Sequence, residues 1–431
     1  MNKYIERRKK EIKRNMISPG DSAEHIEHLE REQRKRIRTR RLIIAGVIVV
    51  AALLVVACFM WYRYHRYTSY ELKWEKELPE GSFVGYEHFG ENVIKYSHDG
   101  ASYIDKTAKD VWVDTFEMGS PKAYVSGEYA CIYDAQGSQI RIYGTEGLLG
   151  NITTVQPVTK AVVAESGVCA AILEDNDASY ITFFKKDGTD LDITIKSRLD
   201  GDGYPIDIAL SPEGTQLICS FAFLDGGALR SKVIFYDFSE IGKNVPNRLV
   251  GGFEENFRDS LVPRVRFINS VYSYAVADSG VYIFSSKNIS SPELVKVIET
   301  GERIESIANM KNHLAVIYTD LVMDEVTTDD DGNEVVNHVP TENSSSYRLV
   351  VYKEDGSILF ERIFDNRFDT LTADDSFIYI IGNENLTILS MQDIVKYSDY
   401  VEDPARMITH SSTPGAFIFS GTSYMREYQF K

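Results

Sequence analysis

Residues 349–363 read LVVYKEDGSILFERI, and this stretch holds the pattern that decides the fold. β-Branched and aromatic residues favour strands, and the central Asp-Gly is typical of a tight turn between antiparallel strands. Similar strand–turn–strand phrases recur along the chain about every 40 residues, with longer gaps before the fourth, fifth and sixth. The eight phrases begin at Ser102, Ile140, Ile181, Val233, Val281, Leu349, Leu386 and Thr422.

A second strand–turn–strand phrase precedes these, as in KAYVSGEYACIYD (122–134) and TLTADDSFIYIIGN (370–383). Together the two phrases give four strands in about 40 residues, the period of a β-propeller blade. We therefore predict an all-β, eight-bladed β-propeller with four-stranded blades over residues 70–431. Two β-sandwiches are the alternative, but they do not predict a repeated four-strand unit. The lone strand YELKWEKEL (70–78) is expected to close the ring as the outer strand of the last blade.

The charge distribution divides the chain. Residues 1–41 hold 14 Lys/Arg and 7 Asp/Glu, whereas the remainder holds 33 Lys/Arg and 57 Asp/Glu. Between these parts, residues 42–60 read LIIAGVIVVAALLVVACFM, with Trp61 and Tyr62 directly after. About 20 apolar residues cross a bilayer as a helix, and aromatic residues gather at its interfaces. We predict a transmembrane helix over 42–62; the alternatives are a signal-peptide core, which is shorter, and a buried helix.

The flanks of this segment predict its orientation. Arg38, Arg40 and Arg41 crowd its N-terminal side, and the positive-inside rule then places the N-terminus in the cytoplasm. The expected layout is a single-pass protein of the cell membrane. It has a helical basic cytoplasmic tail (1–41), a juxtamembrane linker (63–69) and an extracytoplasmic propeller. The tail either sets topology and binds anionic lipid or docks a cytoplasmic partner. The net charge of −17 argues against nucleic-acid binding by the body of the protein.

An acidic insertion interrupts the sixth repeat at residues 320–346. It contains eight acidic residues and no Lys or Arg. Its segments LVMDEVTT (321–328) and NEVVNHV (333–339) are expected to pair as a hairpin around Asp-Asp-Gly. One interpretation is a solvated hairpin, and the other is an arm that docks a basic or cationic partner. Alignment with a calcium loop fails at both ends, so we predict no metal. The candidate partner-binding residues are Asp324, Glu325, Asp329, Asp330, Asp331 and Glu334.

Catalytic signatures are absent from the sequence: there is no nucleophile elbow, no P-loop and no zinc-protease motif. We therefore assign no catalytic, cofactor-binding or metal residue. The sequence places Cys131, Cys169 and Cys219 in second strands of three successive blades, where small buried residues are expected and disulfides are not. A small basic cluster of Arg258, Arg264 and Arg266 is either a solvated strand or an anion site.

The phrases IYDAQGSQIRIY (132–143), FFKKDGTDLDITI (183–195) and VYKEDGSILFERIF (351–364) resemble repeats of the quinoprotein-like propeller superfamily. The layout resembles uncharacterised single-pass membrane proteins of Clostridia-type Gram-positive bacteria, a family without an assigned activity. Quinoprotein blades carry a Thr-Gly turn leading to a Trp. Here Ala108 follows Thr107 before Trp112, which argues against a quinone cofactor. Resemblance to envelope-assembly propellers implies a scaffold.

Three functional hypotheses follow. The first is a membrane-anchored, non-catalytic binding or scaffold module in the cell envelope, with a protein or glycan partner. The second is a transmembrane sensor that relays an external signal to the tail. The third is an enzyme with its site in the propeller channel.

Overall fold

The computed structural model describes residues 23–78, 83–319, 324–328, 334–338, 346–402 and 405–431. The chain divides into two compact units, Met1–His65 and Arg66–Lys431.

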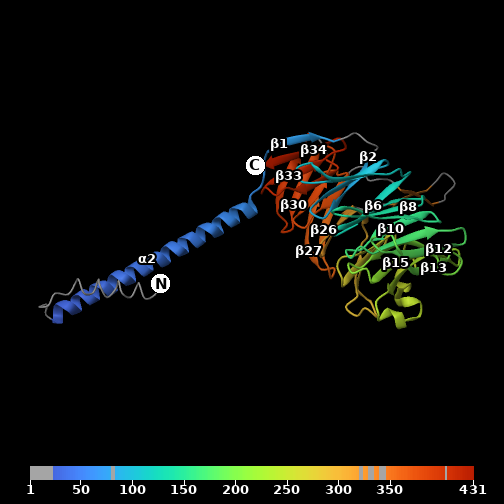
Figure 1. The fold of residues 1–431 in the computed structure, drawn as a ribbon, viewed down its shortest axis with the longest axis horizontal. Helices are drawn as coiled ribbons and strands as arrows, with labels where there is room; N and C mark the ends of the chain where they lie inside the picture. The colour runs from blue at the N-terminus through green and yellow to red at the C-terminus, as the bar shows by residue number, and fades with distance from the viewer. Residues whose placement is uncertain (1–22, 79–82, 320–323, 329–333, 339–345, 403–404) are drawn as a thin grey trace. The chain divides into compact units, whose positions relative to one another are not determined.

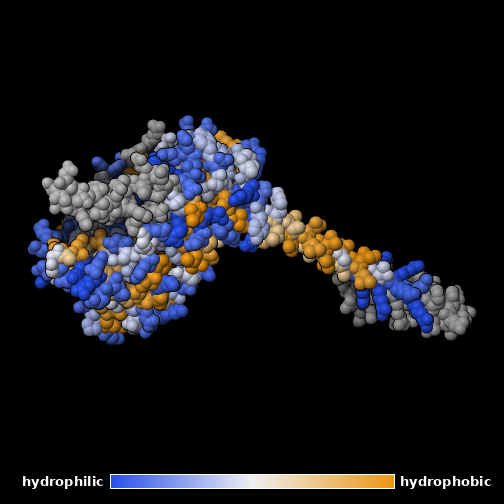
Figure 2. All heavy atoms as spheres, turned by 180° about the vertical axis from the view of Figure 1, so that it is seen from behind, coloured by the Kyte–Doolittle hydropathy of each residue, from blue (hydrophilic) through white to orange (hydrophobic). Residues whose placement is uncertain are grey.

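The first unit is described from Ala23 onward and consists of one helix, α2 (Ala23–Tyr64). Within it, Lys35–Trp61 is long and apolar enough to cross a membrane, and none of its most apolar stretch is buried. Figure 2 shows these apolar side chains as an exposed band along the helix. The predicted span lies inside this helix. Arg38, Arg40 and Arg41 are exposed on it, and the ring of Trp61 lies 4.8 Å from that of His65.

The second unit is a ring of eight four-stranded antiparallel sheets, so the predicted eight-bladed propeller is confirmed (Figure 1). Blades 1 and 2 comprise β2 (Phe83–Phe89), β3 (Asn92–Ser97), β4 (Gly100–Ile104), β5 (Asp110–Thr115); and β6 (Pro121–Ser126), β7 (Tyr129–Asp134), β8 (Gln139–Gly144), β9 (Gly147–Thr153). Blades 3 and 4 comprise β10 (Val158–Val163), β11 (Cys169–Glu174), β12 (Ala178–Phe184), β13 (Asp190–Arg198); and β14 (Tyr204–Leu210), β15 (Gln216–Asp225), β16 (Ala228–Asp237), β17 (Leu249–Phe253).

The remaining blades follow the same order. Blades 5 and 6 comprise β18 (Arg264–Phe267), β19 (Tyr272–Ala277), β20 (Gly280–Ser285), β21 (Glu293–Glu299); and β22 (Arg303–Met310), β23 (His313–Thr319), β26 (Tyr347–Lys353), β27 (Ile358–Phe364). Blades 7 and 8 comprise β28 (Thr370–Ala373), β29 (Phe377–Ile381), β30 (Asn385–Ser390), β31 (Val395–Tyr400); and β32 (Met407–His410), β33 (Ala416–Ser420), β34 (Tyr424–Phe430), β1 (Tyr70–Glu77). Three short 3-10 helices, η1 (Gly242–Asn244), η2 (Pro246–Arg248) and η3 (Glu255–Phe257), flank β17.

The Asp-Gly turns have a common local cause. Gly188 and Gly356 adopt φ of +85° and +78°, a left-handed conformation that glycine tolerates best. In each turn the preceding aspartate accepts a hydrogen bond from the backbone N–H two residues on: Asp187 from Thr189 and Asp355 from Ser357, each at 2.9 Å. These turns join the third and fourth strands of blades 3 and 6, as the repeat predicts.

The core consists of apolar layers between adjacent blades. The middle strands are buried on both faces, so they read as continuous apolar runs rather than alternating ones. Cys131 and Cys169 lie in the layer between blades 2 and 3, and Cys219 lies in the next layer. All three are fully buried and free, in agreement with their interpretation as small packing residues.

The ring is closed by strands from both ends of the second unit. β1 pairs antiparallel with β34, from Tyr70↔Phe430 to Glu77↔Tyr424, which confirms the predicted closure (Figure 1). The residues before β1 are bonded to the last two blades: the Tyr67 N–H donates to Lys396 O of β31 at 2.6 Å, and the Lys431 N–H donates to Ser69 O at 2.9 Å.

The two faces of the ring carry different connections. Because strands alternate in direction, turns between first and second strands and between third and fourth strands share one face, here the AB face. Turns between second and third strands and the links between blades form the opposite BC face. Residues 66–69 precede a fourth strand and lie at the AB face. The insertion in blade 6 joins its second and third strands and therefore leaves from the BC face.

Candidate functional site

The acidic insertion contains the predicted hairpin. β24 (Asp324–Thr328) and β25 (Glu334–His338) pair antiparallel, with Asp324 opposite His338 and Thr328 opposite Glu334. Three of the six candidate residues, Asp324, Glu325 and Glu334, therefore lie on one two-stranded ladder. The other three, Asp329, Asp330 and Asp331, fall outside the described residues. We call residues 320–346 the acidic arm.

The arm leaves blade 6 without disturbing its ladder. β23 and β26 stay paired in unbroken register from His313↔Lys353 to Thr319↔Tyr347, so the two ends of the arm begin at adjacent positions. An insertion whose ends meet on an intact ladder leaves the geometry of the blade unchanged. The propeller therefore forms a rigid base for the arm.

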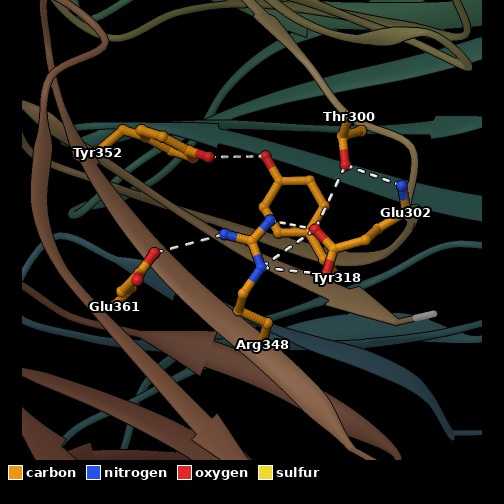
Figure 3. Close-up of polar contacts among 6 residues, drawn as sticks. All are labelled: Thr300, Glu302, Tyr318, Arg348, Tyr352 and Glu361. Carbon is orange, nitrogen blue, oxygen red and sulfur yellow. Dashed lines mark hydrogen bonds and ion pairs between the residues drawn. The ribbon is translucent and has the colours of Figure 1, made fainter. Parts of the chain in front are cut away.

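Arg348, one residue past Tyr347, organises a polar network at this base (Figure 3). Its Nε donates to both carboxylate oxygens of Glu302, at 3.0 and 3.1 Å, and its Nη2 also contacts Glu302. Its Nη1 reaches Glu361 Oε2 at 3.4 Å. The guanidinium lies 4.8 Å from the centroid of the Tyr318 ring, a cation–π arrangement.

The tyrosines complete the network in Figure 3. The hydroxyls of Tyr318 and Tyr352 hydrogen-bond to each other at 2.9 Å. Burial and the neighbouring Tyr352 raise the pKa of Tyr318, so its hydroxyl stays protonated. Hydrogen bonding to Glu302 raises the pKa of Arg348. The network pairs one arginine with two glutamates, so it carries a net negative charge at the base of an arm that is itself negative. Sequence reasoning missed this network because Glu302 and Arg348 are 46 residues apart and belong to no motif.

A second cluster of charged side chains lies on the axis of the ring. First strands of neighbouring blades contact one another around this axis. One residue from the first strand of each of blades 1 to 5 contributes; we call these five the axial cluster: Glu87, Tyr124, Lys160, Asp207 and Arg266.

Contacts within the axial cluster are unequal. Lys160 Nζ lies 2.8 Å from Asp207 Oδ1, and the Val265 N–H donates to Asp207 Oδ2 at 2.9 Å. The Arg266 guanidinium instead lies 4.4 Å from the centroid of the Tyr124 ring. Of the predicted basic cluster, Arg258 and Arg264 are exposed and only Arg266 is half-buried, so the structure separates the three arginines.

A third polar group lies at the AB face. Asp374 Oδ2 accepts from the Tyr379 hydroxyl at 2.6 Å and contacts His410 Nδ1 at 2.9 Å. Its Oδ1 accepts from two backbone N–H groups. Burial opposes ionisation of Asp374, but hydrogen bonds from His410 and Tyr379 outweigh it and lower the pKa of Asp374 to about 2. His88 lies nearby, and burial lowers its pKa. His88, Asp374 and His410 belong to three different blades, so no spacing in the sequence indicates this grouping.

Metal ligation has no support within these groups. Across the residues that the structure describes, no three His, Cys, Asp or Glu side chains come together in an arrangement that would hold an ion.

Comparison with protein families places the chain. The model for a family described as "Family of unknown function (DUF5711)" matches residues 63–430. The chain belongs to this family. The match begins just after the apolar stretch Lys35–Trp61 and covers the whole propeller. No curated protein matches this DUF5711 chain.

Solved structures resemble the DUF5711 propeller at low identity. BamB from Moraxella catarrhalis is 13% identical over 84% of this chain and 100% of its own, with a TM-score of 0.46. Sqt1 from Chaetomium thermophilum is 11% identical over 84% of this chain and 98% of its own, with a TM-score of 0.47. Hydrazine synthase from Kuenenia stuttgartiensis is 12% identical over 82% and 97%, with a TM-score of 0.40. We draw no functional argument from these likenesses.

Proposed function

We propose that this protein is a membrane-anchored, extracytoplasmic binding or scaffold module of the cell envelope, and that its acidic arm docks a basic or cationic partner on a protein or glycan. The observation that carries the proposal is the paired arm on an undisturbed blade, with Arg348 and Glu302 locking its base. Loops and hairpins held by a rigid scaffold are common binding elements because the scaffold limits the entropy lost on binding.

Charge supports the choice of a basic partner. The arm carries eight acidic residues without a Lys or Arg, and the network at its base adds net negative charge. Complementary charge accelerates association and excludes partners of the same sign. The same argument disfavours nucleic acid as a ligand of the propeller.

Membrane anchoring rests on the apolar helix and its flanks. The helix Lys35–Trp61 meets the length and apolar character of a span, and Arg38, Arg40 and Arg41 precede its apolar core. Anchoring by this helix, a cytoplasmic N-terminus and contact of the basic tail with anionic lipid are parts of the proposal. A cleaved signal sequence is the competing assignment of the same helix.

The non-catalytic assignment is also part of the proposal. In the axial cluster Lys160 is held by Asp207 and Arg266 lies on Tyr124, so both basic groups are engaged within the fold. A sensor is the second candidate, because α2 runs without a break from Ala23 to Tyr64 and Tyr67 is already bonded to the last blades.

A charge-neutralised arm tests the proposal. The variant Asp324→Asn, Glu325→Gln, Glu334→Gln changes three described ladder positions without changing their size. The matched control neutralises Glu117, Glu146 and Glu165, which are exposed on the propeller. Affinity capture from solubilised membranes should recover fewer partners with the arm variant and the full set with the control. Equal recovery by both variants would overturn the role of the arm.

A further inference from the structure

The two faces of the ring differ in charge. Leaving the acidic arm aside, the described connections of the BC face hold 15 Asp/Glu and 3 Lys/Arg. The described connections of the AB face, with residues 66–69 and Lys431 included, hold 13 Asp/Glu and 10 Lys/Arg. The AB face is therefore close to neutral, and the BC face is strongly negative even without the arm. A surface of one sign attracts partners of the opposite sign.

The blade 4 hairpin leaves from the same BC face as the acidic arm. This hairpin, β15 and β16, joins the second and third strands of blade 4, and the arm makes the same connection in blade 6. β15 and β16 are ten residues long, whereas the middle strands of the other blades have five to seven residues. Apolar layers pack blade 5 against blade 4 on one side and blade 6 on the other, so the hairpin and the arm flank blade 5.

The end of the blade 4 hairpin extends beyond its four-stranded sheet. β14 pairs with β15 only as far as Ala222, and β17 pairs with β16 only from Val233 onward. Further out, Phe223–Asp225 pairs with Ala228–Arg230 as a two-stranded ladder around Gly226-Gly227. No third strand joins this ladder in the described part of the chain. Its edges are therefore open to pairing with a strand from another molecule.

Two exposed leucines lie side by side on this ladder. Leu224 pairs with Leu229, and the two residues are 75% and 58% exposed. The charged groups beside them are paired with each other, since Arg230 Nε lies 3.2 Å from Asp225 Oδ2. Apolar side chains at this exposure add little to the stability of the fold, because little of their surface is removed from water. They remain available to an apolar group of a partner.

A polypeptide matches these features together. Its backbone can add a strand to an open edge, its apolar side chains can cover the leucines, and its Lys or Arg side chains can face the acidic connections. A glycan does not present backbone amides at the spacing of a strand. We propose that the BC face binds a basic polypeptide segment with alternating apolar side chains, held by the blade 4 hairpin and the acidic arm. This inference rests on the proposed function, because it assigns the partner of the arm to proteins and gives that partner a second contact.

Peptide binding to the full chain in phosphatidylcholine nanodiscs tests the surface. The probes are fluorescent peptides of equal length that alternate lysine with leucine, lysine with serine, or glutamate with leucine, together with a labelled cationic chitosan oligomer. Fluorescence anisotropy reports each dissociation constant, and empty nanodiscs give the background. We expect the lysine–leucine peptide to bind most tightly, because it alone offers both the charge and the apolar groups.

The variant Leu224→Thr, Leu229→Thr removes the apolar pair from the hairpin. The matched control, Val111→Thr, Val113→Thr, changes two exposed residues of β5 in blade 1. The hairpin variant should weaken binding of the lysine–leucine peptide about tenfold and leave binding of the lysine–serine peptide unchanged. The control should change neither. In the wild type, the lysine–leucine peptide should slow amide hydrogen exchange over Phe223–Arg230, as an added strand would.

The outcomes separate this inference from the proposed function. Unchanged binding of the lysine–leucine peptide to the hairpin variant, or no binding to the wild type, overturns the hairpin contact. Weaker binding of both lysine peptides to the arm variant would then keep the proposed function in place, and the reverse pattern would keep the hairpin and remove the arm. Equal binding of the glutamate–leucine peptide overturns the choice of a basic partner. A chitosan oligomer that binds as tightly as the lysine–leucine peptide overturns the assignment to protein.

Discussion

Replacement of Asp374 by asparagine should destabilise the propeller in a pH-dependent way. The carboxylate of Asp374 accepts from Tyr379, from two backbone N–H groups and from His410, and these bonds hold its pKa near 2 against a usual value of 3.8. Each pKa unit corresponds to about 1.4 kcal/mol, so ionised Asp374 contributes about 2 kcal/mol. The asparagine side chain keeps the shape of the aspartate but loses its charge.

The sign of the pH dependence follows from the lowered pKa. A group whose pKa falls on folding stabilises the protein above its unfolded pKa, and this contribution is lost as pH falls from about 4 towards 2. His410 shows the other side of the same pair: its hydrogen bond to Asp374 raises its pKa, so its contribution fades as pH rises through that raised value. The two shifts describe one interaction and are not added.

Thermal unfolding of the full chain in detergent measures the effect. For a domain of this size, 2 kcal/mol corresponds to a melting temperature lower by about 3 °C. The difference between wild type and Asp374→Asn should be largest near pH 5–7 and fall to about a third of that value at pH 2.5. Glu117→Gln, at an exposed position on the propeller, is the control. A difference that is the same at pH 6 and pH 2.5 would refute the electrostatic explanation.

Three further predictions follow from the closure, the arm base and the helix. Tyr70→Ala should lower the stability of the propeller by about 2 kcal/mol, because it removes a half-buried ring that packs on Tyr397 and Phe430. The control Lys73→Ala should leave the stability unchanged. Equal melting temperatures for Tyr70→Ala and Lys73→Ala would contradict the closure. Arg348→Met should lower the stability of the propeller by about 1–3 kcal/mol, because Glu302 is left partly buried without its partner. The double variant Arg348→Met, Glu302→Gln should regain most of this stability, because the unpaired charge is then removed. Protease added to intact cells should digest the propeller and spare residues 1–41; protection of the propeller would reverse the proposed topology.

The repeat could be predicted from the sequence because its determinants are local. Strand composition, the Asp-Gly turns and the apolar middle strands each act within a few residues, and they recur in phase. The closing strand was predictable because β1 stands alone before blade 1. The longer gaps also have structural causes: ten-residue strands β15 and β16 with the short helices around β17 in blade 4, and the arm in blade 6.

The candidate sites were less predictable because their members come from distant parts of the chain. Arg266 looked like one of three clustered arginines, yet only Arg266 is half-buried and lies against Tyr124 of another blade, whereas Arg258 and Arg264 are exposed. Glu302 meets Arg348, and Asp374 meets His410, through the ring geometry alone. No spacing in the sequence encodes such contacts, since they depend on which blade faces come together.

The most direct test of the central claim is crosslinking in living cells followed by mass spectrometry, with and without the arm. Because Thr319 pairs with Tyr347, residues 320–346 can be replaced by Asn-Gly, a two-residue turn that closes the ladder. Our account predicts that envelope partners crosslink to the full protein and are lost with the shortened hairpin, while its melting temperature stays within a few degrees. An unchanged set of partners on the shortened protein would contradict it.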